Sequence, residues 1–211
     1  MARPLTEEQH RLLADRIKAA EASTSGEIYC VVARRSDGYF FPAAFMLLTG
    51  IVLVGVAVAV WLDGRWFAVS HSLFALAELS AAAAALLVLW LAPGLRIRLT
   101  PPALRYRRAH DNAVKQFIAH NVHRTGQRTG VLVFVSLAER YAEIVADSGI
   151  NELVGQDEWA GIVADLVASA RADRLHEGLA EAIDRAGVLL ASHFPGGRDN
   201  PNELEDHVVE M

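Results

Sequence analysis

The sequence predicts an α/β domain, with a small mixed sheet covered by helices, that is interrupted by a two-helix transmembrane hairpin. Two observations lead to this prediction. Residues 43–92 contain two long apolar runs separated by a short polar break, and the segments on both sides alternate between helical and strand patterns. We therefore expect one domain assembled from residues 5–38 and 101–194, the hairpin at residues 43–92, and an acidic tail at residues 195–211 that is a loosely held extension.

The first apolar run extends from Ala43 to Leu62 without a charged residue. At about 1.5 Å per residue it spans roughly 30 Å as a helix, which matches the hydrocarbon core of a bilayer. A buried helix of a soluble domain rarely needs this length without a polar face. We therefore expect this run to cross a membrane.

The second run contains one acid, Glu78. The uninterrupted part from Leu79 to Ala92 is too short to cross a bilayer alone, so the spanning helix has to include Glu78. One acid costs about 2.5–3.5 kcal/mol at the centre of an inserting helix, which the many leucines and valines of this run offset together. Small residues spaced four apart predict the faces along which the two helices pack: Gly55 and Ala59 in the first run, and Ala77, Ala81 and Ala85 in the second.

The distribution of basic residues predicts the orientation of the hairpin. Six basic residues precede it and six follow it before residue 116, whereas the connecting turn from Asp63 to Trp66 has only Arg65. By the positive-inside rule, both flanks and both chain ends lie in the cytoplasm and the turn lies outside. The single Cys30 cannot form an intramolecular disulfide, which agrees with a reducing compartment.

The remaining segments predict one sheet assembled from both sides of the hairpin. Strands are expected at residues 28–33, 131–137 and 141–147, the first joined to the second by a helical crossover and the second to the third by a short turn. The first pair is then parallel and the second antiparallel. Helices are expected at about residues 7–22, where Thr6 and Gln9 have capping-box spacing, at about residues 102–122, and in two amphipathic segments after residue 156.

Three stretches carry a resemblance to a known family. Thr24-Ser25-Gly26-Glu27-Ile28 leads into the first strand, Arg128-Thr129-Gly130-Val131-Leu132 leads into the second, and Tyr141-Ala142-Glu143-Ile144-Val145-Ala146-Asp147-Ser148-Gly149-Ile150 follows before the two closing helices. In this order they resemble the TPM-domain family, which includes the thylakoid photosystem repair phosphatase. More closely, the chain resembles a bacterial branch of membrane proteins in which a hairpin interrupts the domain after the first strand. The resemblance covers roughly residues 7–194.

This resemblance implies an α/β/α sandwich, with weak acid-phosphatase activity and divalent-metal binding in some members. If this chain shares the metal-binding property, Asp147, Glu152 and Asp157 are the candidate oxygen ligands for Ca²⁺ or Mg²⁺. These residues surround the turns at Gly149 and Gly155. The alternative is that Asp157 caps a helix and Asp147 is a strand-end turn residue. No EF-hand, P-loop, nucleophile elbow or zinc pattern is present in the sequence.

Charge is distributed unevenly and indicates the partners. Residues 93–128 contain eight basic residues and one acid, whereas residues 139–211 contain sixteen acids and five basic residues. The basic segment adjoins the hairpin, so we expect it to contact anionic lipid heads. A nucleic-acid partner is disfavoured because no recognition motif accompanies these charges and the whole chain is acidic.

Three functions are compatible with these features. The first is a membrane-tethered accessory or scaffold domain that meets other membrane-associated proteins at the cytoplasmic face of a bacterial inner membrane. The second is a metal-assisted acid phosphatase at the membrane, and the third is a small transport or sensing element that uses Glu78. The lack of a complete catalytic constellation favours the first.

Overall fold

The computed structural model describes residues 5–65, 70–196, 202–204 and 207–211. Trp66 of the expected outer turn, and residues 197–201 and 205–206 of the expected tail, lie outside this range. The chain divides into two compact units, one made of Met1–Ser36 with Tyr106–Met211 and the other of Asp37–Arg105. The larger unit is therefore discontinuous in sequence, and each unit is described here by itself.

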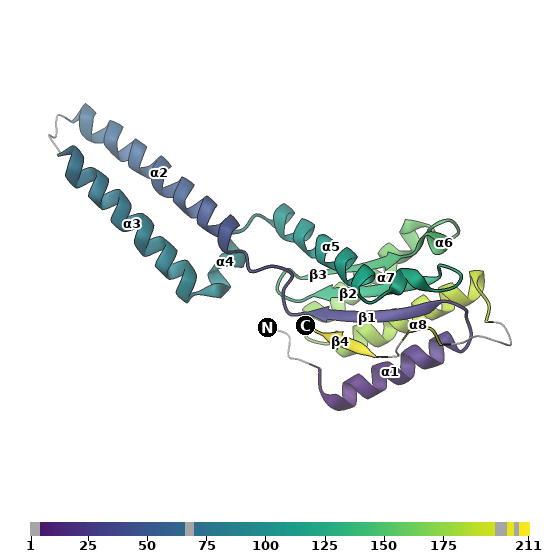
Figure 1. Cartoon of the computed structure of the whole chain (residues 1–211). Helices are drawn as coiled ribbons and strands as arrows, with labels where there is room; N and C mark the ends of the chain where they lie inside the picture. The colour runs from purple at the N-terminus through teal and green to yellow at the C-terminus, as the bar shows by residue number, and fades with distance from the viewer. Residues whose placement is uncertain (1–4, 66–69, 197–201, 205–206) are drawn as a thin grey trace. The chain divides into compact units, whose positions relative to one another are not determined.

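The larger unit contains a four-stranded mixed sheet with the strand order β3-β2-β1-β4 (Figure 1). Strands β1 (Glu27–Ala33) and β2 (Gly130–Ser136) are parallel and pair along their full lengths. Strand β3 (Tyr141–Ala146) pairs antiparallel with β2, as the short turn between them requires. The pairing of β1 with β2 joins segments that lie on opposite sides of residues 37–105 in the sequence.

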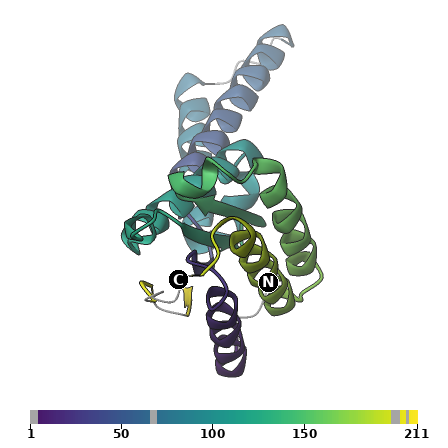
Figure 2. The same cartoon turned by 90° about the vertical axis from the view of Figure 1, so that its right-hand side faces the viewer.

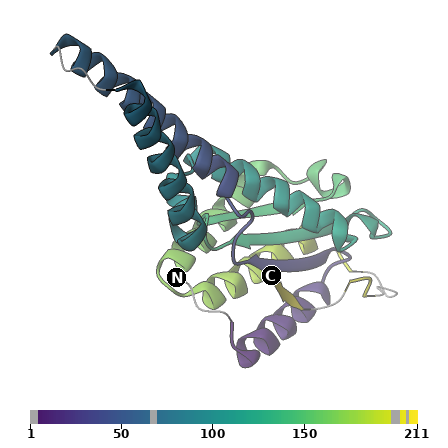
Figure 3. The same ribbon diagram turned by 60° about the vertical axis from the view of Figure 1, so that its left-hand side comes forward.

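Helices cover both faces of this sheet. Alternate residues of β1 and β2 face a core formed with α1 (Glu7–Glu21), α7 (Gln156–Arg171) and α8 (Leu175–His193). The other residues of these strands face α5 (Pro102–Ala119) and the 3-10 turn η1 (Val122–Arg124). Figures 1 and 3 show α5 above the sheet and α1 and α8 below it, and Figure 2 shows α7, α8 and α1 side by side. The predicted α/β/α sandwich with a small mixed sheet is confirmed.

Both central strands are buried on both faces, as expected for strands that helices cover on each side. The core residues on the two faces alternate along β1, with Ile28, Cys30 and Val32 on one side and Tyr29 and Val31 on the other. This alternation follows from the period of two along a strand. The apolar run that predicted the first strand therefore contributes side chains to the cores on both faces of the sheet.

The end of the chain forms a strand, which corrects the expectation of a loosely held tail. Strand β4 (Val208–Glu210) adds to the free edge of β1 in parallel orientation, with Val208 opposite Cys30. The backbone amides of Glu203 and Leu204 donate to the buried carboxylate of Glu27, 3.3 Å in each case. The end of the chain is held because it satisfies the backbone groups of an edge strand and because Val208 is buried in the apolar core.

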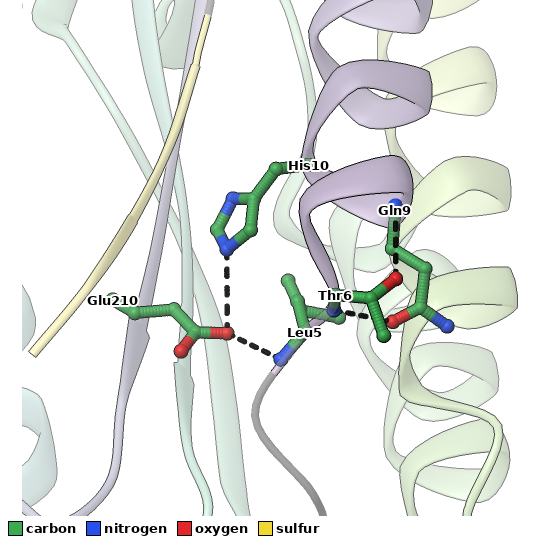
Figure 4. A network of polar contacts seen from close by, with 5 residues as sticks. All are labelled: Leu5, Thr6, Gln9, His10 and Glu210. Carbon is green, nitrogen blue, oxygen red and sulfur yellow. Dashed lines mark hydrogen bonds and ion pairs between the residues drawn. The ribbon is translucent and has the colours of Figure 1, made fainter.

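The first helix is fixed at its start by two sets of polar contacts (Figure 4). Thr6 and Gln9 form the predicted capping box, in which each side chain accepts from the backbone amide of the other residue. One carboxylate oxygen of Glu210 accepts from the amide of Leu5 at 2.7 Å and lies 3.6 Å from Nε2 of His10. Helix α1 and strand β4, from opposite ends of the chain, are therefore linked directly.

The smaller unit consists of two long apolar helices and one short helix. Helix α2 (Phe40–Gly64) and helix α3 (His71–Leu91) pack side by side, and α4 (Pro93–Leu99) packs against both (Figures 1 and 3). As predicted, α3 includes Glu78. Both helices are long and apolar enough to cross a membrane, and most of their side chains are exposed.

The contact between α2 and α3 passes through Gly55 and Glu78. A Cβ atom at Gly55 would lie 1.5 Å from Oε1 of Glu78, so only glycine leaves room for this carboxyl group. Of the small residues expected to form the packing faces, Gly55 contacts the other helix and Ala85 is half-buried, whereas Ala59, Ala77 and Ala81 are exposed. In α3, Glu78 takes the place at the helix contact that was expected for its neighbour Ala77.

The pairing of β1 with β2 leads to a prediction about stability. Val31 is fully buried opposite Phe134, so Val31→Asp would place an unpaired carboxylate in the core and lower the free energy of unfolding by about 3 kcal/mol or more. Residues 106–194 should then become sensitive to protease, although they lie beyond the hairpin. Leu12→Asp, at a 45% exposed position on α1, is the matched control and should leave resistance unchanged. Unchanged resistance in Val31→Asp would contradict the assembly of one domain from both segments.

Candidate functional site

A buried polar cluster lies at the carboxyl ends of the parallel strands β1 and β2. Glu139 is only 2% exposed and accepts a hydrogen bond from the backbone amide of Ser36 at 3.0 Å and another from the hydroxyl of Ser136. The hydroxyls of Ser36 and Ser136 are 2.8 Å apart. Because Ser136 donates to the carboxylate, the Ser36 hydroxyl donates to Ser136. We call Ser36, Ser136 and Glu139 the strand-end cluster.

Helix α5 extends this cluster. The side-chain amide of Asn112 donates to the hydroxyl of Ser36 at 3.4 Å, and Gln116, one turn later, donates to Asn112 at 3.1 Å. The cluster therefore holds together the end of β1, the turn after β2 and the helix above the sheet. Ser36 is the last residue of the larger unit before the chain passes into α2. The polar groups fix the point at which the hairpin leaves the domain.

A second polar group joins α5 to β3. Nδ1 of His110 lies 2.9 Å from a carboxylate oxygen of Glu143, and the hydroxyl of Tyr141 donates to the same carboxylate at 2.9 Å. Burial raises the pKa of Tyr141, and its hydrogen bond to Glu143 raises it further, so the hydroxyl remains a donor. Sequence reasoning missed this group because its members are 33 residues apart; alternation along β3 and the helical period of α5 were the available signals.

His120 lies in a third group, under the tail of the chain. Its ring stacks on Tyr29 with 4.7 Å between centroids, and Nδ1 is 3.0 Å from the tyrosine hydroxyl. His207 contacts the edge of the same tyrosine. Burial lowers the pKa of His120, and the nearby His207 lowers it further. A largely neutral imidazole at this place joins α5, β1 and the tail through packing and one hydrogen bond.

The three carboxylates predicted as metal ligands lie at the ends of two helices, and only Asp147 and Glu152 occupy cap positions, because the N-cap of α7 is Gly155. Asp147 is the N-cap of α6 (Ser148–Asn151), and its Oδ1 accepts from the amide and hydroxyl of Ser148. Glu152 follows the end of α6, and Asp157 lies in the first turn of α7, where a negative charge is favourable. Glu152 and Asp157 are exposed.

These carboxylates do not form a ready-made metal centre. Within the described ranges, no three His, Cys, Asp or Glu side chains are grouped so that they could hold a metal ion. One atom stands out, because Oδ2 of Asp147 is buried and has no hydrogen-bond partner. Buried polar atoms in folded proteins are nearly always paired, so this oxygen distinguishes Asp147 from the other two carboxylates.

The only cysteine, Cys30, is unsuited to chemistry. It is fully buried in β1, and burial raises the pKa of its thiol to about 12. A protonated thiol is neither a good nucleophile nor a good metal ligand. The prediction that Cys30 packs in a buried strand is confirmed.

The fold and these polar groups define a class: a discontinuous α/β/α domain with a mixed sheet and no complete catalytic constellation in the part that the structure describes. Residues 97–189 match the family model of the TPM domain. The chain therefore contains a TPM domain over these residues, as its sequence predicted. The matched range begins in α4 and ends in α8, so it contains β2, β3 and the helices around them, whereas α1 and β1 lie outside it.

A solved structure supports the same fold. The NMR structure of the BA42 protein from the psychrophilic bacterium Bizionia argentinensis matches this chain with a TM-score of 0.62 and 19% sequence identity. The match covers 100% of this chain and 98% of that chain. At this identity the likeness concerns the fold. No curated protein matches the chain.

The strand-end cluster makes a prediction about stability. Glu139→Leu removes both acceptors and leaves the Ser36 amide and the Ser136 hydroxyl unpaired, which costs on the order of 1–3 kcal/mol for each group. Glu139→Gln keeps one carbonyl acceptor and should cost less. The control, Glu181→Leu on the exposed face of α8, should unfold at the denaturant concentration of the natural chain. A midpoint of Glu139→Leu equal to that of the natural chain would show that the two hydrogen bonds contribute little.

Proposed function

We propose that this protein is a membrane-tethered accessory or scaffold domain that acts at the cytoplasmic face of a bacterial inner membrane. Its partners are the lipid bilayer and other membrane or membrane-associated proteins. The TPM domain is compatible with such a role. The hairpin supplies the tether, and the helices and sheet of the larger unit supply the surfaces that meet other proteins.

The observation that supports this proposal most strongly is the exposure of the apolar hairpin. Leu53 and Val60 of α2 are 65% and 69% exposed, and Leu79 and Trp90 of α3 are 68% and 67% exposed. Soluble proteins rarely expose a continuous apolar surface of this extent. A bilayer provides the apolar environment that these side chains require, and both helices have the length to cross it.

Charge supports the cytoplasmic placement of the domain. The residues after α3 include Arg96, Arg98 and Arg105, and further arginines follow on α5, whereas Arg65 is the only basic residue in the short turn between the long helices. The positive-inside rule then places the larger unit in the cytoplasm. The surplus of acids after residue 139 belongs to the segment that is farther from the hairpin in the sequence, and we expect this segment to meet protein partners.

This proposal predicts a definite membrane topology. A reporter that is active only outside the cytoplasm should be active when fused after Gly64 and silent when fused after Met211, because the hairpin crosses twice. A fusion after Ser36, which precedes the hairpin, is the matched control and should be silent. The chain should also remain in the membrane fraction after extraction at alkaline pH. Reporter activity after Met211, or release by alkaline extraction, would contradict the proposal.

A metal-assisted phosphatase is the second candidate, and one observation favours it. The buried, unpaired Oδ2 of Asp147 offers an anionic oxygen of the kind that Ca²⁺ and Mg²⁺ prefer. Glu152 and Asp157 are close to it in the sequence but are not grouped with it into a three-ligand site. A cation held at Asp147 would neutralise the charge of a phosphate ester.

Metal binding at Asp147 is tested by thermal unfolding. The detergent-solubilised chain is treated with a chelator, and unfolding is then followed with Ca²⁺ or Mg²⁺. Binding to the folded state alone stabilises it by about 2.7 kcal/mol when the ion is at a hundredfold excess over Kd. Asp147→Asn should abolish the gain without loss of the cap, since asparagine caps helices as well as aspartate does. Asp15→Asn, on the exposed surface of α1, should retain the gain. If neither ion raised the stability of the folded chain, the metal site would be excluded, and the phosphatase hypothesis with it.

A further inference from the structure

A cavity of about 440 Å³ lies where the turn between β2 and β3 meets the end of α7. Its apolar lining belongs to the core on the α7 and α8 side of the sheet, and Ser136 of the strand-end cluster also lines it. Val135 and Ala142 contribute from the two strands, and Val167 and Ala170 contribute from α7. The volume falls within the range of about 300–1,000 Å³ that small-molecule pockets occupy.

Small side chains account for the space. Ala142 on β3 and Ala170 on α7 both line the cavity, and neither is long enough to fill the gap between strand and helix. Elsewhere along α7 larger side chains such as Ile162 and Leu166 close the same interface and are buried. The cavity thus combines an apolar side formed by core residues with polar side chains of the turn and of the end of α7.

Two arginines line this cavity without partners. Arg140 belongs to the turn after β2, and Arg171 belongs to the last turn of α7. In the described part of the chain, neither guanidinium group has a hydrogen bond or an ion pair, whereas Arg16, Arg174 and Arg185 each contact a carboxylate. Asp173 is the one acid in the lining, so the cavity carries a net positive charge.

The backbone fixes the position of Arg140. This residue has a φ of 54°, in the left-handed region that residues other than glycine rarely adopt. Its backbone amide donates to the carbonyl of Leu137, and Glu139, the residue before it, is held in the strand-end cluster. The turn therefore presents the guanidinium of Arg140 from a constrained backbone, which limits the entropy lost when it binds a ligand.

We propose that this cavity binds a small organic anion, a carboxylate or similar oxyanion carried on a compact apolar body. Arg140 and Arg171 bind the oxyanion, because a guanidinium group presents paired donors that match such a group. Val135, Ala142, Val167 and Ala170 contact the apolar body. The site adds a ligand-binding property to the larger unit, and it does not depend on the membrane topology or on a metal ion at Asp147.

The test uses the full chain in micelles of a nonionic detergent and two fluorinated probes followed by ¹⁹F NMR. The first probe is 4-fluorobenzoate, and the second is 4-fluorobenzamide, its neutral counterpart of nearly equal size. Protein-free micelles correct for partition of the probes into detergent. We expect saturable binding of the benzoate and at least tenfold weaker binding of the benzamide, since the amide has no charge for the guanidinium groups.

Variants separate this site from general attraction of an anion to a protein surface. Arg140→Gln and Arg171→Gln should each weaken benzoate binding about tenfold. Arg174→Gln, three residues after Arg171 and outside the cavity lining, should bind as the natural chain does. Ala170→Leu should weaken binding, because the larger side chain occupies part of the cavity. Both lining arginines are exposed, so their substitution leaves the core intact, which thermal unfolding of each variant verifies. Equal binding of the two probes, no binding of the benzoate, or equal losses in Arg174→Gln and Arg171→Gln would overturn the proposal.

Discussion

The parallel pairing of β1 with β2 is the interaction on which the rest of this structure depends. It places Cys30 and Val31 beside Val133 and Phe134, although about a hundred residues and the whole hairpin separate them in the chain. Each strand contributes alternate side chains to two cores, so neither core is complete without both segments. The chain has to close a long loop before these contacts form, but loop-closure entropy grows only slowly with length. A hairpin held as a packed pair of helices shortens the effective loop further.

Buried carboxylates stabilise the end and the edge of this sheet. Glu139 satisfies the backbone and hydroxyl groups where the chain leaves toward the hairpin, and Glu27 holds the amides of the returning tail. Both carboxylates are nearly fully buried, so each is retained because its partners would otherwise be unpaired. The cavity beside Arg140 lies just beyond the turn that Glu139 fixes. The proposed anion site and the point at which the chain passes toward α2 therefore adjoin the same strand ends.

The sequence predicted the elements that have a strong period and missed those that depend on tertiary contacts. The helices with apolar stripes, the three longer strands and their parallel and antiparallel pairing follow from local patterns. Strand β4 was missed because Val208 and Val209 stand alone among acids, and only the open edge of β1 makes a strand of them. The expected helix at 102–122 ends at Ala119, because Asn121 adopts a left-handed conformation that turns the chain into η1. For the site, sequence spacing selected Asp147 but could not group His110 with Glu143 or Arg140 with Arg171, since those neighbours arise from the fold.

The most direct test of this account is hydrogen exchange of the β1 amides in a chain whose residues 37–105 are replaced by a flexible Gly/Ser linker of about 15 residues. If the domain is assembled from both segments and the hairpin is only a tether, this chain is soluble and the amides of Glu27–Ala33 exchange as slowly as those of Gly130–Ser136, because both strands open only with the whole sheet. Fast exchange of Glu27–Ala33 beside a protected Gly130–Ser136 would contradict the account, since it would show that the second segment folds without the first.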